Sequence, residues 1–203
     1  MGAFTILSMP RDNSKSKRMI LELLHHPEGS LTLYRIAKET GTNISWVVEF
    51  LKRLERKKLL KGTRVVDLDG LIDYYLSLDG KTASLEFHLP QALDYLKTVK
   101  REYALTTYAA ENLVSHHLFP SRIDLYVRKG ELELWKGELF RKGLVGKGNM
   151  RVLVPPDEYL FKFVRTLGGL RVVTVPLLMI DLKREGGVCM QAYEYLVEKY
   201  VSR

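Results

Sequence analysis

The sequence predicts a mixed α/β fold in two parts: a helical N-terminal part and a C-terminal α/β domain built on a small sheet. Three observations lead to this prediction. Apolar residues recur at helical spacing in the first 60 residues of the 203-residue chain. Beyond residue 80, short β-branched segments alternate with helical ones, an order typical of α/β or α+β domains. Between the two parts lies the turn sequence Asp79-Gly80, where we place the domain boundary.

The first helix is expected from residue 16 to residue 25, because Met19, Ile20, Leu23 and Leu24 form its apolar side. Residues 27–29, which include a proline and a glycine, should end it. A second helix follows, with Thr32 as its N-cap. Gly41 should stop this helix, because glycine readily takes the left-handed conformation that a helix C-terminus needs.

A third helix is expected over residues 44–57, and its two faces differ in chemistry. One face is apolar and should pack on the other helices. The other is polar and basic, as in the recognition helix of a helix-turn-helix, which lies in the major groove of DNA. The apolar face consists of Ile44, Val47, Val48, Leu51 and Leu54, and the polar face of Ser45, Trp46, Glu49, Lys52, Arg53 and Arg56. For Trp46, two hypotheses are equally good: it packs on the first helix, or it contacts DNA.

The segment 59–67 predicts a short hairpin with Gly62 at its bend and Lys61 and Arg64 near its tip. Three helices followed by such a hairpin indicate a winged helix-turn-helix, which we assign to residues 1–78. The hairpin residues Lys61 and Arg64 are expected to contact phosphates or the minor groove. Asp69 is expected to cap one further helix, residues 70–78.

The second domain, residues 79–203, is expected to alternate between strands and helices, and few contacts are expected to cross the boundary turn. Residues 131–140 fit either a strand or a helix, and the helix is preferred. Strands are expected at residues 84–89, 103–105, 122–128, 150–154, 160–164 and 171–175, and helices after Pro90 and at residues 107–117, 176–184 and 188–200.

Charge and composition limit the classes of function. The chain has 32 Lys and Arg against 24 Asp and Glu, a formal net charge of +8. Residues 44–64 alone hold seven basic and two acidic side chains. Localised positive charge is typical of a nucleic-acid binder, although it also suits an anionic membrane surface.

Other classes find little support. No apolar run approaches the roughly 18–20 residues of a membrane span, and the N-terminus lacks the layout of a signal peptide. With one cysteine, Cys189, the chain has neither a disulfide framework nor a thiolate zinc site. We therefore expect a cytoplasmic protein.

The order of several short motifs in the second half resembles a known family. The motifs are Tyr103-Ala-Leu-Thr-Thr-Tyr-Ala-Ala-Glu-Asn-Leu113, Arg122-Ile-Asp-Leu-Tyr-Val127, Val152-Leu-Val-Pro155 and Ile180-Asp-Leu182. With the predicted winged helix, they resemble the AbiEi-type antitoxins of type IV toxin–antitoxin (abortive infection) systems. The resemblance covers roughly residues 16–200. Thr107 stands where the family has glycine, and Thr174-Val-Pro-Leu177 replaces its Ser-Pro-Leu-Gln.

The resemblance implies a two-domain repressor. Its N-terminal winged helix would bind double-stranded operator DNA of its own operon, and its C-terminal domain would carry antitoxicity. We also expect the protein to bind DNA as a homodimer. The partner implied is a nucleotidyltransferase-like toxin. The alternatives are a winged helix that serves as a protein-interaction module without specific DNA binding, and a nuclease that uses the C-terminal sheet.

Patterns that suggest other chemistry are incomplete. The Gly-rich basic stretch 136–149 lacks the spacing of a phosphate loop, which leaves a surface connection or a secondary phosphate contact. Adjacent histidines on a helix point about 100° apart, so the pairs at 25–26 and 116–117 are poor metal ligands. Asp124, Glu131, Glu133 and Lys136 miss the Glu-x-Lys spacing of a nuclease. We therefore expect no catalytic residues, no cofactor and no metal.

Overall fold

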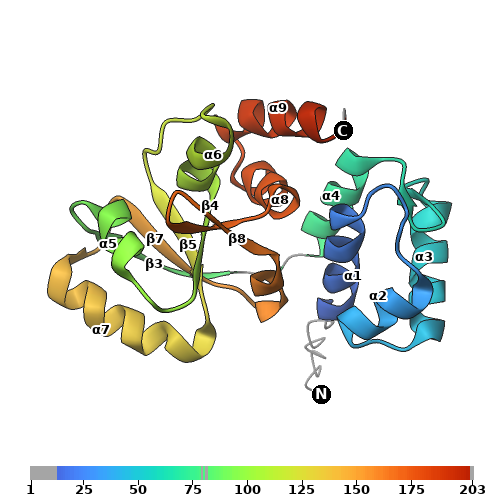
Figure 1. Ribbon diagram of the computed structural model, residues 1–203, viewed down its shortest axis with the longest axis horizontal. Helices are drawn as coiled ribbons and strands as arrows, with labels where there is room; N and C mark the ends of the chain where they lie inside the picture. The colour runs from blue at the N-terminus through green and yellow to red at the C-terminus, as the bar shows by residue number, and fades with distance from the viewer. Residues whose placement is uncertain (1–12, 79, 81, 202–203) are drawn as a thin grey trace, which may run out of the picture.

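The computed structural model describes residues 13–78, 80 and 82–201 and has a mixed α/β architecture with a seven-stranded sheet (Figure 1). A helical N-terminal half lies beside a C-terminal half in which helices cover the sheet. Residues 1–12, together with Asp79 and Lys81 of the boundary turn, lie outside the described residues. Within that part of the chain, no helix is long and apolar enough to cross a membrane.

The N-terminal half contains four helices and a two-stranded hairpin. As expected, Thr32 caps its helix, because its hydroxyl oxygen accepts a hydrogen bond from the Arg35 N–H at 3.1 Å. Gly41 ends that helix in the left-handed conformation, with φ of 65°. The elements are α1 (Ser14–His25), α2 (Leu33–Thr40), α3 (Ile44–Arg56), β1 (Leu60–Lys61), β2 (Arg64–Val65) and α4 (Leu68–Ser77).

The expected cap of α4 was wrong. Asp67, and not Asp69, precedes the helix, and its Oδ1 accepts a hydrogen bond from the Gly70 N–H at 2.8 Å. The Asp69 carboxylate instead accepts hydrogen bonds from Lys183 and from the Tyr193 hydroxyl. A short-range capping pattern cannot distinguish two aspartates two residues apart when one of them has a distant partner.

The sheet has the strand order β6-β3-β7-β5-β4-β9-β8. Parallel pairs join β4 to β9 and β5 to β7, and the other neighbours are antiparallel. The two-residue strand β6 was not predicted, because two residues give no periodic signal. The strands are β3 (Ala83–His88), β4 (Tyr103–Thr106), β5 (Ile123–Val127), β6 (Leu144–Val145), β7 (Met150–Val154), β8 (Val164–Leu167) and β9 (Leu170–Val173).

Helices cover both faces of this sheet, with α6, α8 and α9 on one side and α5 and α7 on the other (Figure 1). Alternate residues of β4 reach the two layers. The Tyr103 ring meets the Trp135 ring of α7 edge-on at 6.1 Å, whereas the hydroxyl of Thr106 donates to Asp181 of α8. The helices are α5 (Ala92–Thr98), α6 (Thr107–Ser115), α7 (Leu132–Lys142), α8 (Val175–Glu185) and α9 (Cys189–Val201).

One predicted strand, residues 160–164, was wrong. The segment forms the 3-10 helix η2 (Glu158–Phe163), and strand β8 begins only at Val164. Asp157 starts η2, because its Oδ1 accepts a hydrogen bond from the Tyr159 N–H at 3.1 Å. Leu160, Phe161 and Phe163 are all buried. Their apolar side chains therefore reflect burial and do not show the alternation of a strand. The preferred helix over 131–140 is confirmed by α7.

The expectation that few contacts cross between the halves was also wrong. The Arg18 guanidinium of α1 binds both oxygens of Asp157, with N···O distances of 2.6 and 3.0 Å. Buried Glu22 accepts hydrogen bonds from Tyr159 and Lys162. Three more contacts join the halves: Lys183 with Asp69 and with Asp73 at 2.8 and 2.6 Å, and the Tyr200 hydroxyl donating to the Leu24 carbonyl at 2.6 Å.

His25, the last residue of α1, is also part of this contact. Its Nδ1 lies 2.6 Å from the Leu21 carbonyl oxygen, which can only accept, so Nδ1 carries the proton. Its Nε2 lies 2.6 Å from the Thr174 hydroxyl, and its ring stacks on Phe163 at 3.9 Å. Burial lowers the pKa of His25 from 6.5 to about 4.

This lowered pKa makes stability depend on pH. The folded protein holds fewer protons on His25 than the unfolded chain does, so the free energy of unfolding falls as the pH drops below about 6.5 and levels off near pH 4. We expect His25 to contribute about 2–3 kcal/mol to this loss. Urea denaturation between pH 7 and pH 4 measures how much more free energy of unfolding the wild type loses than His25→Gln does. The same pH dependence in both proteins would contradict the assignment.

Candidate nucleic-acid interface

Helix α3 is fixed in the N-terminal half by an apolar face. Asn43 starts the helix, because its Oδ1 accepts a hydrogen bond from the Trp46 N–H at 2.8 Å. Two expected core residues differ from the prediction. Ile44 is 47% exposed, and Val48 is only half-buried. The side chains that pack inside are Val47, Phe50, Leu51 and Leu54, of which Phe50 was missed.

The opposite face of α3 points outward, as the sequence predicts. Trp46 is half-buried and stacks on Phe50 with the ring centroids 5.3 Å apart, so part of its surface packs on its own helix. The Arg53 guanidinium lies 6.0 Å from the centre of the same Phe50 ring. The exposed residues of the face are Ser45, Glu49, Lys52, Arg53 and Arg56.

The hairpin β1–β2 is tied to both of its neighbours. Its register pairs Lys61 with Arg64, and both side chains are exposed. The Gly62 N–H at the bend, where φ is 62°, donates to Glu55 Oε1 of α3 at 2.6 Å. On the other side, the Thr63 hydroxyl donates to the Gly29 carbonyl at 3.0 Å. The hairpin cations are therefore held in a defined position beside α3.

Among the residues that the structure describes, the cations of α3 and the hairpin lack acidic partners. Of the two acidic residues in this segment, Glu55 accepts the Gly62 N–H, and Glu49 forms no ion pair with a described residue. The surface therefore combines fixed backbone geometry with uncompensated positive charge, which is the chemistry that binds phosphates. Seven exposed cations have no carboxylate within 4 Å among the described residues: Lys52, Arg53, Arg56, Lys57, Lys58, Lys61 and Arg64.

The other sequence candidates do not converge on one site. Asp124 is fully buried in β5, whereas Glu133 forms an ion pair with Lys136 along α7 at 2.7 Å. His117 stacks on Tyr195 with 5.2 Å between the ring centroids. Among residues 13–78, 80 and 82–201, no group of three His, Cys, Asp or Glu side chains has the arrangement of a metal site.

Two aspartates in the C-terminal half form a buried polar network. Asp124 accepts hydrogen bonds from Thr107 and from the guanidinium groups of Arg122 and Arg151. Asp181 accepts them from Thr106, Tyr126 and Arg184, and burial raises its pKa, although Arg184 opposes the shift. Glu185 completes the network by binding Arg122 and Arg151 at 2.6 and 2.7 Å.

The network lines a hollow of about 260 Å³ whose walls come from β3, β4, β5, β7 and α8. All three carboxylates are paired with arginines, so we interpret the network as one that holds the strands and α8 together and not as a catalytic site. Sequence reasoning placed Asp124 on an alternating strand and did not foresee that every residue of β5 is buried.

Thr107 occupies a backbone conformation that threonine rarely adopts. Its φ is 47°, in the left-handed region, where the β-branched side chain crowds the backbone. It is the first residue of α6 and follows β4 directly, so the chain turns there from the sheet into the helix. Its hydroxyl donates to buried Asp124, which offsets part of the conformational cost.

Two variants separate the strain at Thr107 from the hydrogen bond. Both Thr107→Gly and Thr107→Ala remove the hydroxyl, but only glycine relieves the crowding at positive φ. We expect the glycine variant to be more stable than the alanine variant by about 0.5–1 kcal/mol, after the larger entropy of an unfolded glycine is subtracted. Urea denaturation measures the difference, and an alanine variant of equal or greater stability would contradict it.

None of the protein-family models, curated proteins or solved structures with which the chain was compared matches it.

Proposed function

We propose that this protein is a DNA-binding transcriptional regulator, with residues 13–78 acting as a winged helix-turn-helix. The observation that carries the proposal is the outward face of α3 and its hairpin, where seven exposed cations stand on a fixed backbone without acidic partners. In this reading α3 enters the major groove and the hairpin lies along the backbone. Ser45, Trp46 and Glu49, in the first turns of α3, reach base edges.

The C-terminal half carries the further proposal that the chain acts as an AbiEi-type antitoxin. It would repress its own operon as a cytoplasmic homodimer and counter a nucleotidyltransferase-like toxin. The positive φ of Thr107 supports the resemblance, because the family has glycine, the residue that best tolerates this conformation, at that position. The motif residue Glu111 also has a structural role, since its buried carboxylate accepts the N–H groups of His117 and Leu118.

A second candidate is a protein-interaction module. It is favoured by apolar side chains beside the basic face, since Tyr34 of α2 is 67% exposed and Ile44 of α3 is 47% exposed. Salt distinguishes the two functions. Phosphate contacts make duplex binding fall steeply as salt rises, whereas an apolar protein contact depends little on salt.

The double variant Lys52→Ala/Arg53→Ala tests the role of α3. Both side chains are exposed and outside the core, so we expect the fold to survive and duplex binding to weaken for every sequence. The slope of log K against log salt should become shallower by about 1.8, because about 0.9 is lost per phosphate contact on duplex DNA. Fluorescence anisotropy with a duplex taken from upstream of the gene, and with a scrambled duplex, measures both quantities.

The control for this test is Lys129→Ala/Lys199→Ala, which removes two exposed lysines of the C-terminal half. It should bind both duplexes as the wild type does. Unchanged duplex binding by Lys52→Ala/Arg53→Ala at low salt would overturn the assignment of α3.

The hairpin cations should position the protein without reading sequence. We expect Lys61→Ala and Arg64→Ala each to weaken duplex binding by about 0.5–1.5 kcal/mol, the worth of one hydrogen bond. The loss should be equal for the upstream and the scrambled duplex in the same anisotropy assay. A change in the ratio of the two affinities would show instead that the hairpin reads bases.

A further inference from the structure

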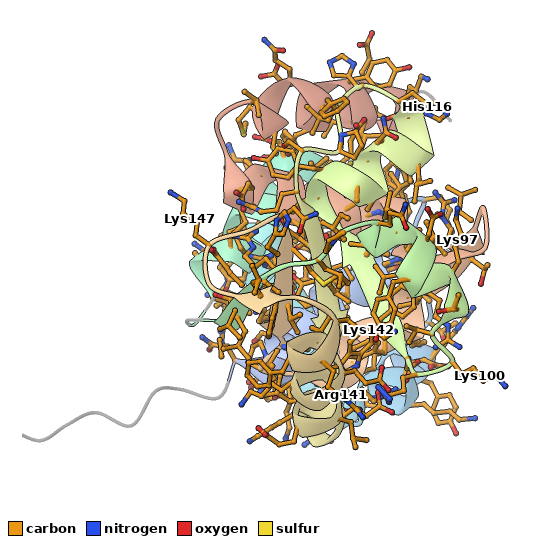
Figure 2. All side chains as sticks on the ribbon, turned by 90° about the vertical axis from the view of Figure 1, so that its left-hand side faces the viewer. Lys97, Lys100, His116, Arg141, Lys142 and Lys147 are labelled. Carbon is orange, nitrogen blue, oxygen red and sulfur yellow. The ribbon has the colours of Figure 1, made fainter. Side chains whose placement is uncertain are left out.

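Helices α5 and α7 lie at the end of the molecule opposite to α3 (Figure 1), and residues of both helices line a groove. Its volume is about 640 Å³. Figure 2 shows Lys100, Arg141 and Lys142 on this face, which is turned away from the N-terminal half. The groove is lined by Tyr95, Thr98, Val99, Lys100, Arg101, Glu138, Arg141 and Lys142.

Positive charge in this groove is not balanced. Its one carboxylate, Glu138, accepts hydrogen bonds from the Tyr95 hydroxyl at 2.7 Å and from Arg101. The Arg141 Nε donates to the carbonyl of Gly137 in its own helix at 3.0 Å. The Lys142 ammonium lies 5.4 Å from the centre of the Tyr95 ring. Neither side chain, nor that of Lys100, has a carboxylate within 4 Å among the described residues.

A second hollow, of about 510 Å³, adjoins the first, because Lys100 and Arg101 line both. It adds two more cations, Arg165 and Arg171, which form no ion pair with any residue that the structure describes. It also adds two carboxylates, Glu102, which is paired with Arg128, and Glu131. The Arg171 Nη1 donates to the Arg101 carbonyl at 3.0 Å, which fixes one guanidinium at the junction. The two hollows therefore form one continuous basic track from α7 to β8.

This arrangement differs from the rest of the C-terminal half, where most cations are paired and the others, such as Lys129 and Lys199, do not line a hollow with further cations. Arg122, Arg128, Arg151, Lys162 and Lys183 each have a carboxylate within 4 Å. Along the track, five cations have no carboxylate within 4 Å among the described residues, whereas two of its three carboxylates, Glu138 and Glu102, are already paired with Arg101 and Arg128. This leaves an excess of positive charge, and an anionic ligand would relieve the repulsion between the cations. The lining offers charge and hydroxyl groups but no exposed aromatic ring for stacking, so phosphate is the group it is best suited to hold.

We propose that this track binds a single-stranded nucleic acid through its phosphates, without regard to base sequence. The site is lined on two sides by α5 and α7 and continues into a second hollow, so a narrow strand can follow it from phosphate to phosphate. A duplex is a wide convex cylinder and would rest on the rim. The α5–α7 end of the track is at the other end of the molecule from α3, so this site is separate from the proposed operator contact.

The test uses the full chain and fluorescein-labelled 20-nucleotide single strands of RNA and of DNA with mixed sequence. Arg141→Ala/Lys142→Ala should weaken the binding of single strands at least tenfold and make the salt slope shallower by about 1.4, at about 0.7 per contact. Lys129→Ala/Lys199→Ala, whose lysines lie outside both hollows, should bind as the wild type does. Lys52→Ala/Arg53→Ala should lose duplex binding yet keep single-strand binding.

Three results would overturn the proposal. One is single-strand binding by Arg141→Ala/Lys142→Ala that equals that of the wild type, with thermal melting showing that the variant is folded. Another is an equal loss of upstream-duplex binding in this variant, which would make the track part of the operator contact. The third is displacement of the labelled strand by ATP at an equal phosphate concentration, which would identify a site for free nucleotides.

Discussion

Asp124 lies at the centre of the sheet with no exposure to water, and an ionised carboxylate in such a place is stable only when cations and hydrogen-bond donors surround it. Arg122 and Arg151 supply the cations, the first from the residue before β5 and the second from its parallel neighbour β7. Both arginines also bind Glu185 at the end of α8. One buried charge thus fixes two central strands and the helix that covers them, and removing either partner would leave the others uncompensated.

Helix α8 carries this constraint into the N-terminal half. Its Lys183 is paired with two aspartates of α4, while the residues around η2 hold α1. Because α1 packs against α2 and α4, the orientation of α3 depends on contacts made by residues far away in the sequence. The chain therefore passes from helix α4 to strand β3 around the predicted boundary at residues 79–81, but the halves on either side are joined by a polar interface.

Local signals were sufficient for most of the elements. Caps such as Thr32, stops such as Gly41 and a clear apolar period correctly located α1 to α3 and the β1–β2 hairpin. The outward face of the recognition-helix candidate was also predicted, since exposure follows directly from helical spacing. Prediction failed where a distant partner decides the outcome. Asp69 could cap its helix but binds Lys183 instead, and apolar Leu160 lies in a 3-10 helix that Asp157 begins.

The candidate sites show the same division. The basic character of α3 is evident from a few adjacent residues, but the track between α5 and α7 combines charges from four segments of the chain. Phe50 was missed because its position between two faces gave no clear assignment, although its ring supports both Trp46 and Arg53. The burial of Asp124 was not predictable, because an aspartate on a strand gives no sign that both faces are covered.

The two outer strands of the sheet limit how copies of this chain can associate. On one side β6 has only two residues and pairs with Phe87 and His88 alone, so the first residues of β3 form part of that edge. On the other side the sheet ends in β8, where Arg165 and Thr166 are exposed. Short or charged edges give another chain few free backbone groups with which to pair. Growth of the sheet from one molecule to the next is thereby disfavoured at β6 and at β8, so a second copy that extended the sheet would have to pair with the first residues of β3.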